Sequence, residues 1–177
     1  FNLTAPPGDP SPLVVHWPAL VSAKHLSQQV VVESEEYQVP TLPQDLQPVD
    51  VEASAYQHLP EPNGEMRKVA FGRAFATRSG DKGGNANLGV WSKNLVGYAF
   101  LKDFLTGQKL QELLPDLKPY EIDRYEFPKL NALNFYIKGI LGDGAAASKR
   151  FDPQAKTLGE YLRAKVMEIP ESLIKER

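Results

Sequence analysis

The sequence predicts an α+β fold in which helices cover one face of an antiparallel sheet, preceded by an extended proline-rich arm. After residue 66, strand-like alternation and helix-like periodicity follow in the order strand, strand, helix, strand, strand, helix. Ten of the fifteen prolines lie before residue 63, whereas eleven of the thirteen glycines lie after Met66. The net charge changes from −8 over residues 1–65 to +6 over residues 66–177. We therefore place a domain boundary between residues 65 and 66.

Residues 1–65 read as an acidic, proline-rich arm or linker that forms the tail of a preceding domain. Within it we expect a short helix over 20–29, a strand over 30–34 and a linker over 39–65. The chain begins at Phe1, so we expect a fragment or a processed product. Asn2 stands in an Asn-Leu-Thr sequon, which is weak evidence for glycosylation.

The first two elements of residues 66–177 are predicted strands. Residues 68–77 alternate between larger side chains and a face of small ones, which a helix can approach closely. Residues 87–91 form the second strand, and the glycine-rich stretch between the two predicts a long hairpin loop.

Helices and strands then alternate to the end of the chain. Residues 95–105 predict a helix, and Thr106 is an N-cap for a second helix that Pro115 ends. Strands are predicted on either side of Pro128, with Asp152-Pro153 opening a further helix. The strands cover 120–127, 131–140 and, as a short edge strand, 166–170.

Composition excludes several classes of site. The chain has no cysteine, so it has no disulfide and no thiolate nucleophile or metal ligand. No apolar run approaches the roughly 18 residues of a membrane span, and we expect a cytoplasmic protein without membrane contact. His16, His25 and His58 show no ligand spacing, so we expect no metal.

Ser79 and Lys82 match the S-x-x-K spacing of a serine nucleophile activated by a lysine. That chemistry needs both side chains on one helical turn and a neutral lysine. Gly80 and the Gly83-Gly84 pair disfavour a helix, and Asp81 favours the charged lysine. The pattern therefore argues against a catalytic dyad, and the catalytic residues remain unknown.

Two interpretations of the stretch 78–87 stay open. In the first, glycine backbone amides surround an anion while Arg78 and Lys82 supply charge. In the second, Gly and Asn only supply turn geometry, and Asp81 pairs with Lys82 or Arg78. On the first interpretation the substrate-binding candidates are Arg78, Ser79, Asp81, Lys82, Gly83, Gly84, Asn85, Asn87 and Arg124.

Weaker candidates lie later in the chain. The loop 141–150 carries Lys149 and Arg150 close to the predicted helix start at Asp152, which makes it the second candidate anion site. Periodicity assigns most aromatic side chains to the core. These are Trp91, Tyr98, Phe100, Phe104, Tyr125, Phe127, Phe135 and Tyr136.

Three motifs carry a family resemblance. The stretches RSGDKGGNANLGVW, DRYEFPKLNALNFYIKGILGDG and DPQAKTLGEYL, in this order, resemble the C-terminal ferredoxin-like domain of the AtuA (acyclic terpene utilisation) family over about residues 67–174. The resemblance implies a two-layer ferredoxin-like sandwich that follows a larger domain. It also implies a place in the breakdown of acyclic terpenes through coenzyme A thioesters.

Two functional classes follow, and whether the chain is an enzyme stays open. In the first, the module binds the anionic part of an acyl or acyl-CoA substrate through the loop Arg78–Asn87. In the second, it is a non-catalytic oligomerisation or interaction module whose loop is only a turn. We expect no cofactor other than a coenzyme A thioester as substrate. As partners we expect an anionic small molecule, a preceding domain or partner chain, and a homo-oligomer, but no nucleic acid.

Overall fold

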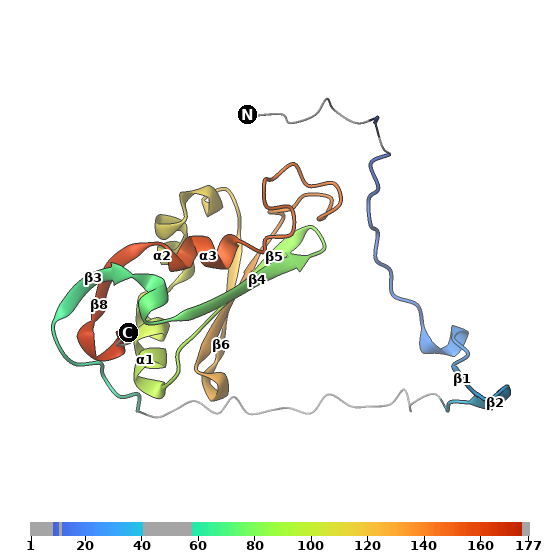
Figure 1. The fold of residues 1–177 in the computed structure, drawn as a ribbon, viewed down its shortest axis with the longest axis horizontal. Coiled ribbons are helices and arrows are strands. Elements are labelled where there is room, and N and C mark those ends of the chain that lie inside the picture. The colour runs from blue at the N-terminus through green and yellow to red at the C-terminus, as the bar shows by residue number, and fades with distance from the viewer. Residues whose placement is uncertain (1–8, 11, 41–57, 175–177) are drawn as a thin grey trace. The chain divides into compact units, whose positions relative to one another are not determined.

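A computed structural model describes residues 9–10, 12–40 and 58–174 (Figure 1). The chain divides into two compact units, Trp17–Ser54 and the remainder, Phe1–His16 with Ala55–Arg177. Most of the predicted linker 39–65 lies outside the described residues, so the extended arm and the boundary at residue 65 stay predictions.

The smaller unit contains a two-stranded hairpin of β1 (Gln29–Val32) and β2 (Glu35–Gln38), in which Val30 pairs with Tyr37. The predicted helix over 20–29 is wrong, because only the 3-10 turn Ala23–His25 forms there. The predicted strand over 30–34 ends early because the chain reverses at Glu33 and Ser34, both with positive φ. All eight strand residues are exposed.

The larger unit is built on two antiparallel sheets. Its four-stranded sheet has the order β4-β5-β7-β6, and β3 pairs separately with β8. The strands are β3 (Met66–Ala70), β4 (Ala76–Lys82), β5 (Asn85–Trp91), β6 (Ile122–Phe127), β7 (Ala132–Ile137) and β8 (Val166–Pro170).

The single strand predicted over 68–77 is two strands, because a 3-10 turn at Phe71–Arg73 interrupts it. Phe71 is fully buried, and its amide donates to the Lys165 carbonyl at 2.8 Å. The turn therefore lets the chain leave β8 and begin pairing with β5, a change of partner that alternation alone does not reveal.

The first two helices form as predicted, α1 over Leu95–Phe104 and α2 over Gly107–Leu113. The Thr106 side chain caps α2 by accepting from the Lys109 amide. The predicted start of the last helix at Asp152 is wrong, since α3 covers only Leu158–Arg163. The Asp152 carboxylate instead accepts from the amides of Lys156 and Thr157 and closes a turn.

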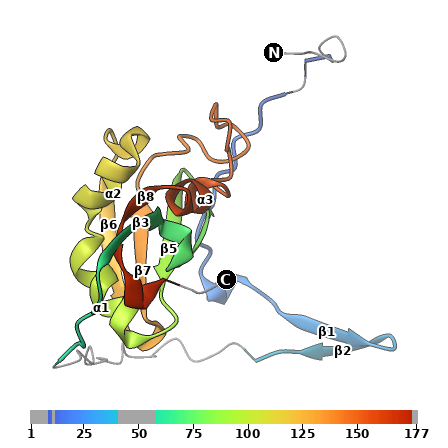
Figure 2. The ribbon, with the colours of Figure 1, turned by 60° about the vertical axis from the view of Figure 1, so that its left-hand side comes forward.

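One face of the four-stranded sheet packs on the helices, and the strand alternation decides which side chains lie there (Figure 2). Leu88 of β5 and Phe135 of β7 are fully buried and belong to one core cluster with Leu101 of α1 and Leu158 of α3. This arrangement confirms the α+β class and the position of the helices on one face. Among the described residues, no helix has the length and apolar character needed to span a membrane.

The opposite side of this sheet is called the open face below. Alternation places on it the residues that flank the buried ones along each strand. They are Ala76, Arg78, Gly80 and Lys82 of β4, Asn85, Asn87, Gly89 and Trp91 of β5, Asp123, Tyr125 and Phe127 of β6, and Ala132, Asn134 and Tyr136 of β7.

Candidate functional site: a cationic cluster around Gly80

The stretch that predicted a long loop is a tight hairpin. β4 and β5 pair without a break from Ala76↔Trp91 to Lys82↔Asn85, so the turn is only Gly83-Gly84. Gly83 has φ +63°, which its lack of a side chain permits. The prediction of a long loop is therefore wrong. Successive backbone amides of a paired strand point to opposite edges of that strand, so they do not surround one anion.

Ser79 lies on the face of the sheet that the helices cover. Its hydroxyl oxygen accepts from the Gly159 amide at 2.9 Å and donates to the Lys156 carbonyl at 3.2 Å. Lys82 is three residues further along the same strand, so alternation places it on the opposite face. Ser79 therefore holds the segment before α3 against β4 and does not form a dyad with Lys82.

Three cations surround Gly80. Arg78 and Lys82 flank it along β4 and are exposed, and a methyl group placed on Gly80 would lie 3.6 Å from Lys156 Nζ. The Lys156 carbonyl is on the Ser79 side of β4 and its amine is beside Gly80, so its side chain extends around this edge strand. Arg78, Lys82 and Lys156, with Asn87 opposite Gly80, are called the Gly80 cluster.

The charges of this cluster are not neutralised within the described part of the chain. Lys82 Nζ donates to the backbone carbonyl of Asp81 at 2.9 Å, and the described carboxylates form no ion pair with Arg78, Lys82 or Lys156. The Asp81 ion pair expected for a simple turn is therefore not seen. Lys138 differs, because it forms ion pairs with Glu121 and Asp123. Hydrogen bonds to these two carboxylates stabilise the protonated lysine and raise its pKa.

The asparagines have separate roles. Asn87 Nδ2 donates to Asn134 Oδ1 at 3.2 Å, which keeps both amides on the open face beside the cluster. Asn85 accepts from the Gly139 amide at 2.7 Å and donates to the Tyr136 hydroxyl, so it fixes the loop after β7 to the hairpin. Gly84 is needed for the same contact, because a methyl group there would collide with the Gly142 carbonyl.

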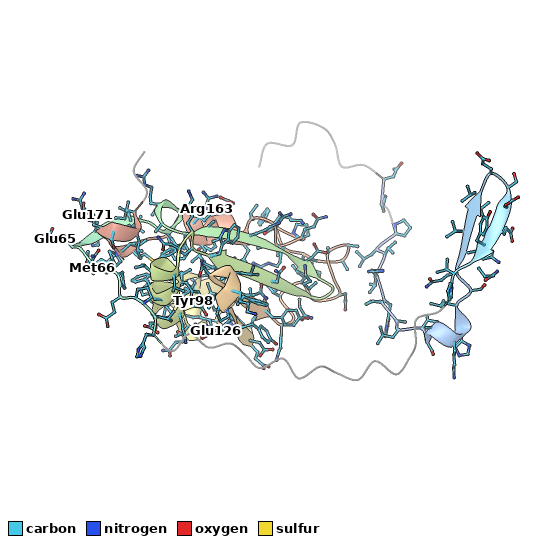
Figure 3. All side chains as sticks on the ribbon, turned by 90° about the horizontal axis from the view of Figure 1, so that it is seen from below. Glu65, Met66, Tyr98, Glu126, Arg163 and Glu171 are labelled. Carbon is cyan, nitrogen blue, oxygen red and sulfur yellow. The ribbon has the colours of Figure 1, made fainter. Side chains whose placement is uncertain are left out.

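Arg124 is not brought to the cluster. It pairs with Phe135 in register and therefore faces the helices, where it donates to the Lys102 carbonyl at 2.7 Å and to Glu126 at 2.9 Å. Glu126 also accepts from the Tyr98 hydroxyl at 3.5 Å, and Figure 3 labels both side chains. Arg124 connects β6 to α1.

The open face also carries exposed aromatic side chains, so the assignment of Trp91, Tyr125 and Phe127 to the core was wrong. Tyr98 and Phe135 are buried as predicted, but Trp91, Tyr125 and Phe127 are 38%, 49% and 45% exposed. Trp91 and Phe127 lie in one cross-strand row, joined by Ala132. Strand alternation directs all three aromatic residues away from the helices.

The sequence did not single out Lys156, whose place in the cluster depends on the turn that precedes α3. The lysine is 74 positions after Lys82 in the printed sequence, and no local pattern relates the two. Among the described residues, no group of three or more potential ligands is placed to hold a metal ion.

A family model for the AtuA ferredoxin-like domain matches residues 65–168, more than half of the chain. The chain belongs to this family. The match includes the whole Gly80 cluster and every element from β3 to α3. No match was found among curated proteins or among solved structures.

Proposed function

We propose that this AtuA ferredoxin-like domain is the C-terminal module of a protein of acyclic terpene or acyl-CoA catabolism, and that it binds the anionic part of an acyl or acyl-CoA substrate. The observation that supports this most is that Lys156 Nζ lies beside Gly80, on the sheet face that alternation gives to Arg78 and Lys82, and that none of the three cations pairs with a described carboxylate. A carboxylate or phosphate suits such a group, because charge-assisted hydrogen bonds from arginine and lysine are the strong ones.

The remainder of the open face suits an apolar chain. The row of Ala76, Trp91, Ala132 and Phe127 is four residues along β4 from Gly80, about 13 Å at the usual rise of a strand. Gly89 lies between the two ends and presents no side chain to obstruct a ligand. An anionic head at the Gly80 cluster thus leaves an acyl chain within reach of the aromatic row.

The test is a calorimetric titration of the chain with coenzyme A, a prenyl-CoA and a free prenyl acid. Lys156→Ala should weaken binding of the free acid by about 1–3 kcal/mol, the usual size for a charged hydrogen bond. Lys93→Ala is the matched control, since Lys93 is an exposed lysine in the β5–α1 connection. Equal affinities for the two variants would contradict the proposal.

A second candidate function is an interaction module that assembles a homo-oligomer or binds a preceding domain. The exposed Trp91, Tyr125 and Phe127 support it, because aromatic residues are enriched in protein interfaces. Sedimentation velocity separates the two candidates: Trp91→Ser with Phe127→Ser should dissociate an assembly built on this face. An unchanged sedimentation coefficient would exclude that role for these two side chains.

A further inference from the structure

Two neighbouring cavities lie outside the Gly80 cluster, beside the loop that follows β7. One, of about 370 Å³, is bounded by Asp116, Phe151 and Tyr161, and the other, of about 400 Å³, by Tyr120 and Ser148. Lys149 and Arg150 line both cavities. The two cations therefore lie between the cavities, and a ligand in either cavity can contact them.

Lys149 and Arg150 have free charges in the described part of the chain. Neither forms an ion pair there, and the Ser148 hydroxyl beside them accepts only a long 3.4 Å bond from the Arg150 amide. Asp143 lines the second cavity, so two cations face one carboxylate there. The guanidinium of Arg150 presents parallel donors that match two oxygens of a phosphate.

The first cavity adds aromatic surfaces. Phe151 is 98% exposed and Tyr161 is 41% exposed, although both are large apolar side chains. One face of the Tyr161 ring is covered by Lys165 Nζ, 4.0 Å from the ring centroid. Planar ligands stack on such rings, and a protonated lysine on the far side of the ring completes a cation–π contact.

We propose that these two cavities together bind a nucleoside phosphate. The phosphate lies against Lys149 and Arg150, and the base stacks on Phe151 and Tyr161. The Asp116 carboxylate at the cavity wall accepts hydrogen bonds from ribose hydroxyls or from an exocyclic amine. Asp152 does not serve in this way, because the amides of Lys156 and Thr157 and the Thr157 hydroxyl occupy its oxygens.

The source of such a ligand is either a free nucleotide or the nucleotide part of a larger coenzyme. Both present the same base, ribose and phosphate to the cavities. The site uses none of the side chains of the Gly80 cluster, so it stands or fails independently of the proposed acyl site.

The test is an NMR titration of the isotope-labelled full chain with AMP, adenosine and inorganic phosphate. Phe151→Ala should weaken AMP and adenosine roughly tenfold, the order expected for loss of one stacking contact, and leave phosphate binding unchanged. Arg150→Ala should weaken AMP and phosphate but not adenosine. Trp17→Ala and Lys93→Ala are the controls, an exposed aromatic and an exposed lysine elsewhere on the chain.

Absence of saturable AMP binding would overturn the proposal, as would AMP binding that both Phe151→Ala and Arg150→Ala leave intact. Competition with coenzyme A identifies the source: displacement of AMP indicates the nucleotide part of a coenzyme, and no displacement indicates a free nucleotide. A Lys156→Ala variant should bind AMP normally while losing affinity for a free prenyl acid, which separates failure of this site from failure of the acyl site.

Discussion

The two faces of the four-stranded sheet are made by the same strands but differ in almost every physical property. On the covered face, Leu88 and Phe135 are fully buried and pack against the helices. On the open face, Arg78 and Lys82 form no ion pair with a described carboxylate, and Trp91 and Phe127 contact solvent. Alternation thus places one set of residues in the core and leaves the other set, which includes the proposed ligand contacts, at the surface.

The largest effect that tests this contrast comes from removing one phenylalanine from each face. Phe135→Ala should lower the free energy of unfolding by about 3–5 kcal/mol, because it leaves a cavity in the core. Phe127→Ala should lower the free energy of unfolding by no more than about 1 kcal/mol, since the side chain is already nearly half exposed. Urea denaturation of the two variants measures both values. Equal losses would show that the open face is covered in solution.

A smaller effect is expected at adjacent residues of β4. Ser79→Ala should lower the free energy of unfolding by about 1–3 kcal/mol, because it leaves the buried Gly159 amide without its acceptor. Arg78→Ala should change stability by no more than about 0.5 kcal/mol, as is usual for surface substitutions.

The same Ser79→Ala variant also sharpens the contrast through binding. Ser79 donates to the Lys156 carbonyl, so its loss should weaken binding of a free prenyl acid even though Ser79 does not face the ligand. Thermal unfolding and calorimetry on one sample compare the two effects. A destabilised variant with unchanged affinity would show that Lys156 does not depend on this anchor.

The smallest effect concerns salt. Raising ionic strength from about 0.01 M to about 1 M shortens the Debye length from about 30 Å to about 3 Å. Binding of a prenyl acid to exposed cations should weaken by about 1 kcal/mol, roughly fivefold. Stability, which depends on the apolar covered face, should change far less in the same titration. Salt-independent binding would place the ligand away from the Gly80 cluster.

Much of the fold could be predicted because its signals are local. Thr106 caps the start of α2, and Pro115, which has no amide hydrogen, marks its end. Alternation along β7 places Leu133, Phe135 and Ile137 on one face, and all three are buried. The failures are partly non-local. The change of partner at Phe71–Arg73 depends on the hydrogen bond from the Phe71 amide to the distant Lys165 carbonyl. The last helix starts late because Asp152 closes a local turn onto Lys156 and Thr157, and because the distant Ser79 hydroxyl accepts from the Gly159 amide.

The candidate site was predicted only in part for the same reason. Arg78, Lys82 and Asn87 do lie together, because strand pairing follows from the hairpin itself. Ser79, Asn85 and Arg124 hold other elements in place instead, since partners distant in sequence use their polar atoms. Lys156 enters the cluster only through the fold of residues 152–157.

The course of the Lys156 side chain has a further consequence, for self-association. β4 is an edge strand of the four-stranded sheet, and the edge of a strand can pair with strands of other molecules. Lysines beside such an edge repel a second copy brought up against it, because burying an uncompensated charge is costly. Lys156 and Lys82 thus make ordered aggregation through β4 unfavourable. Replacing both lysines with neutral residues should make concentrated protein aggregate sooner.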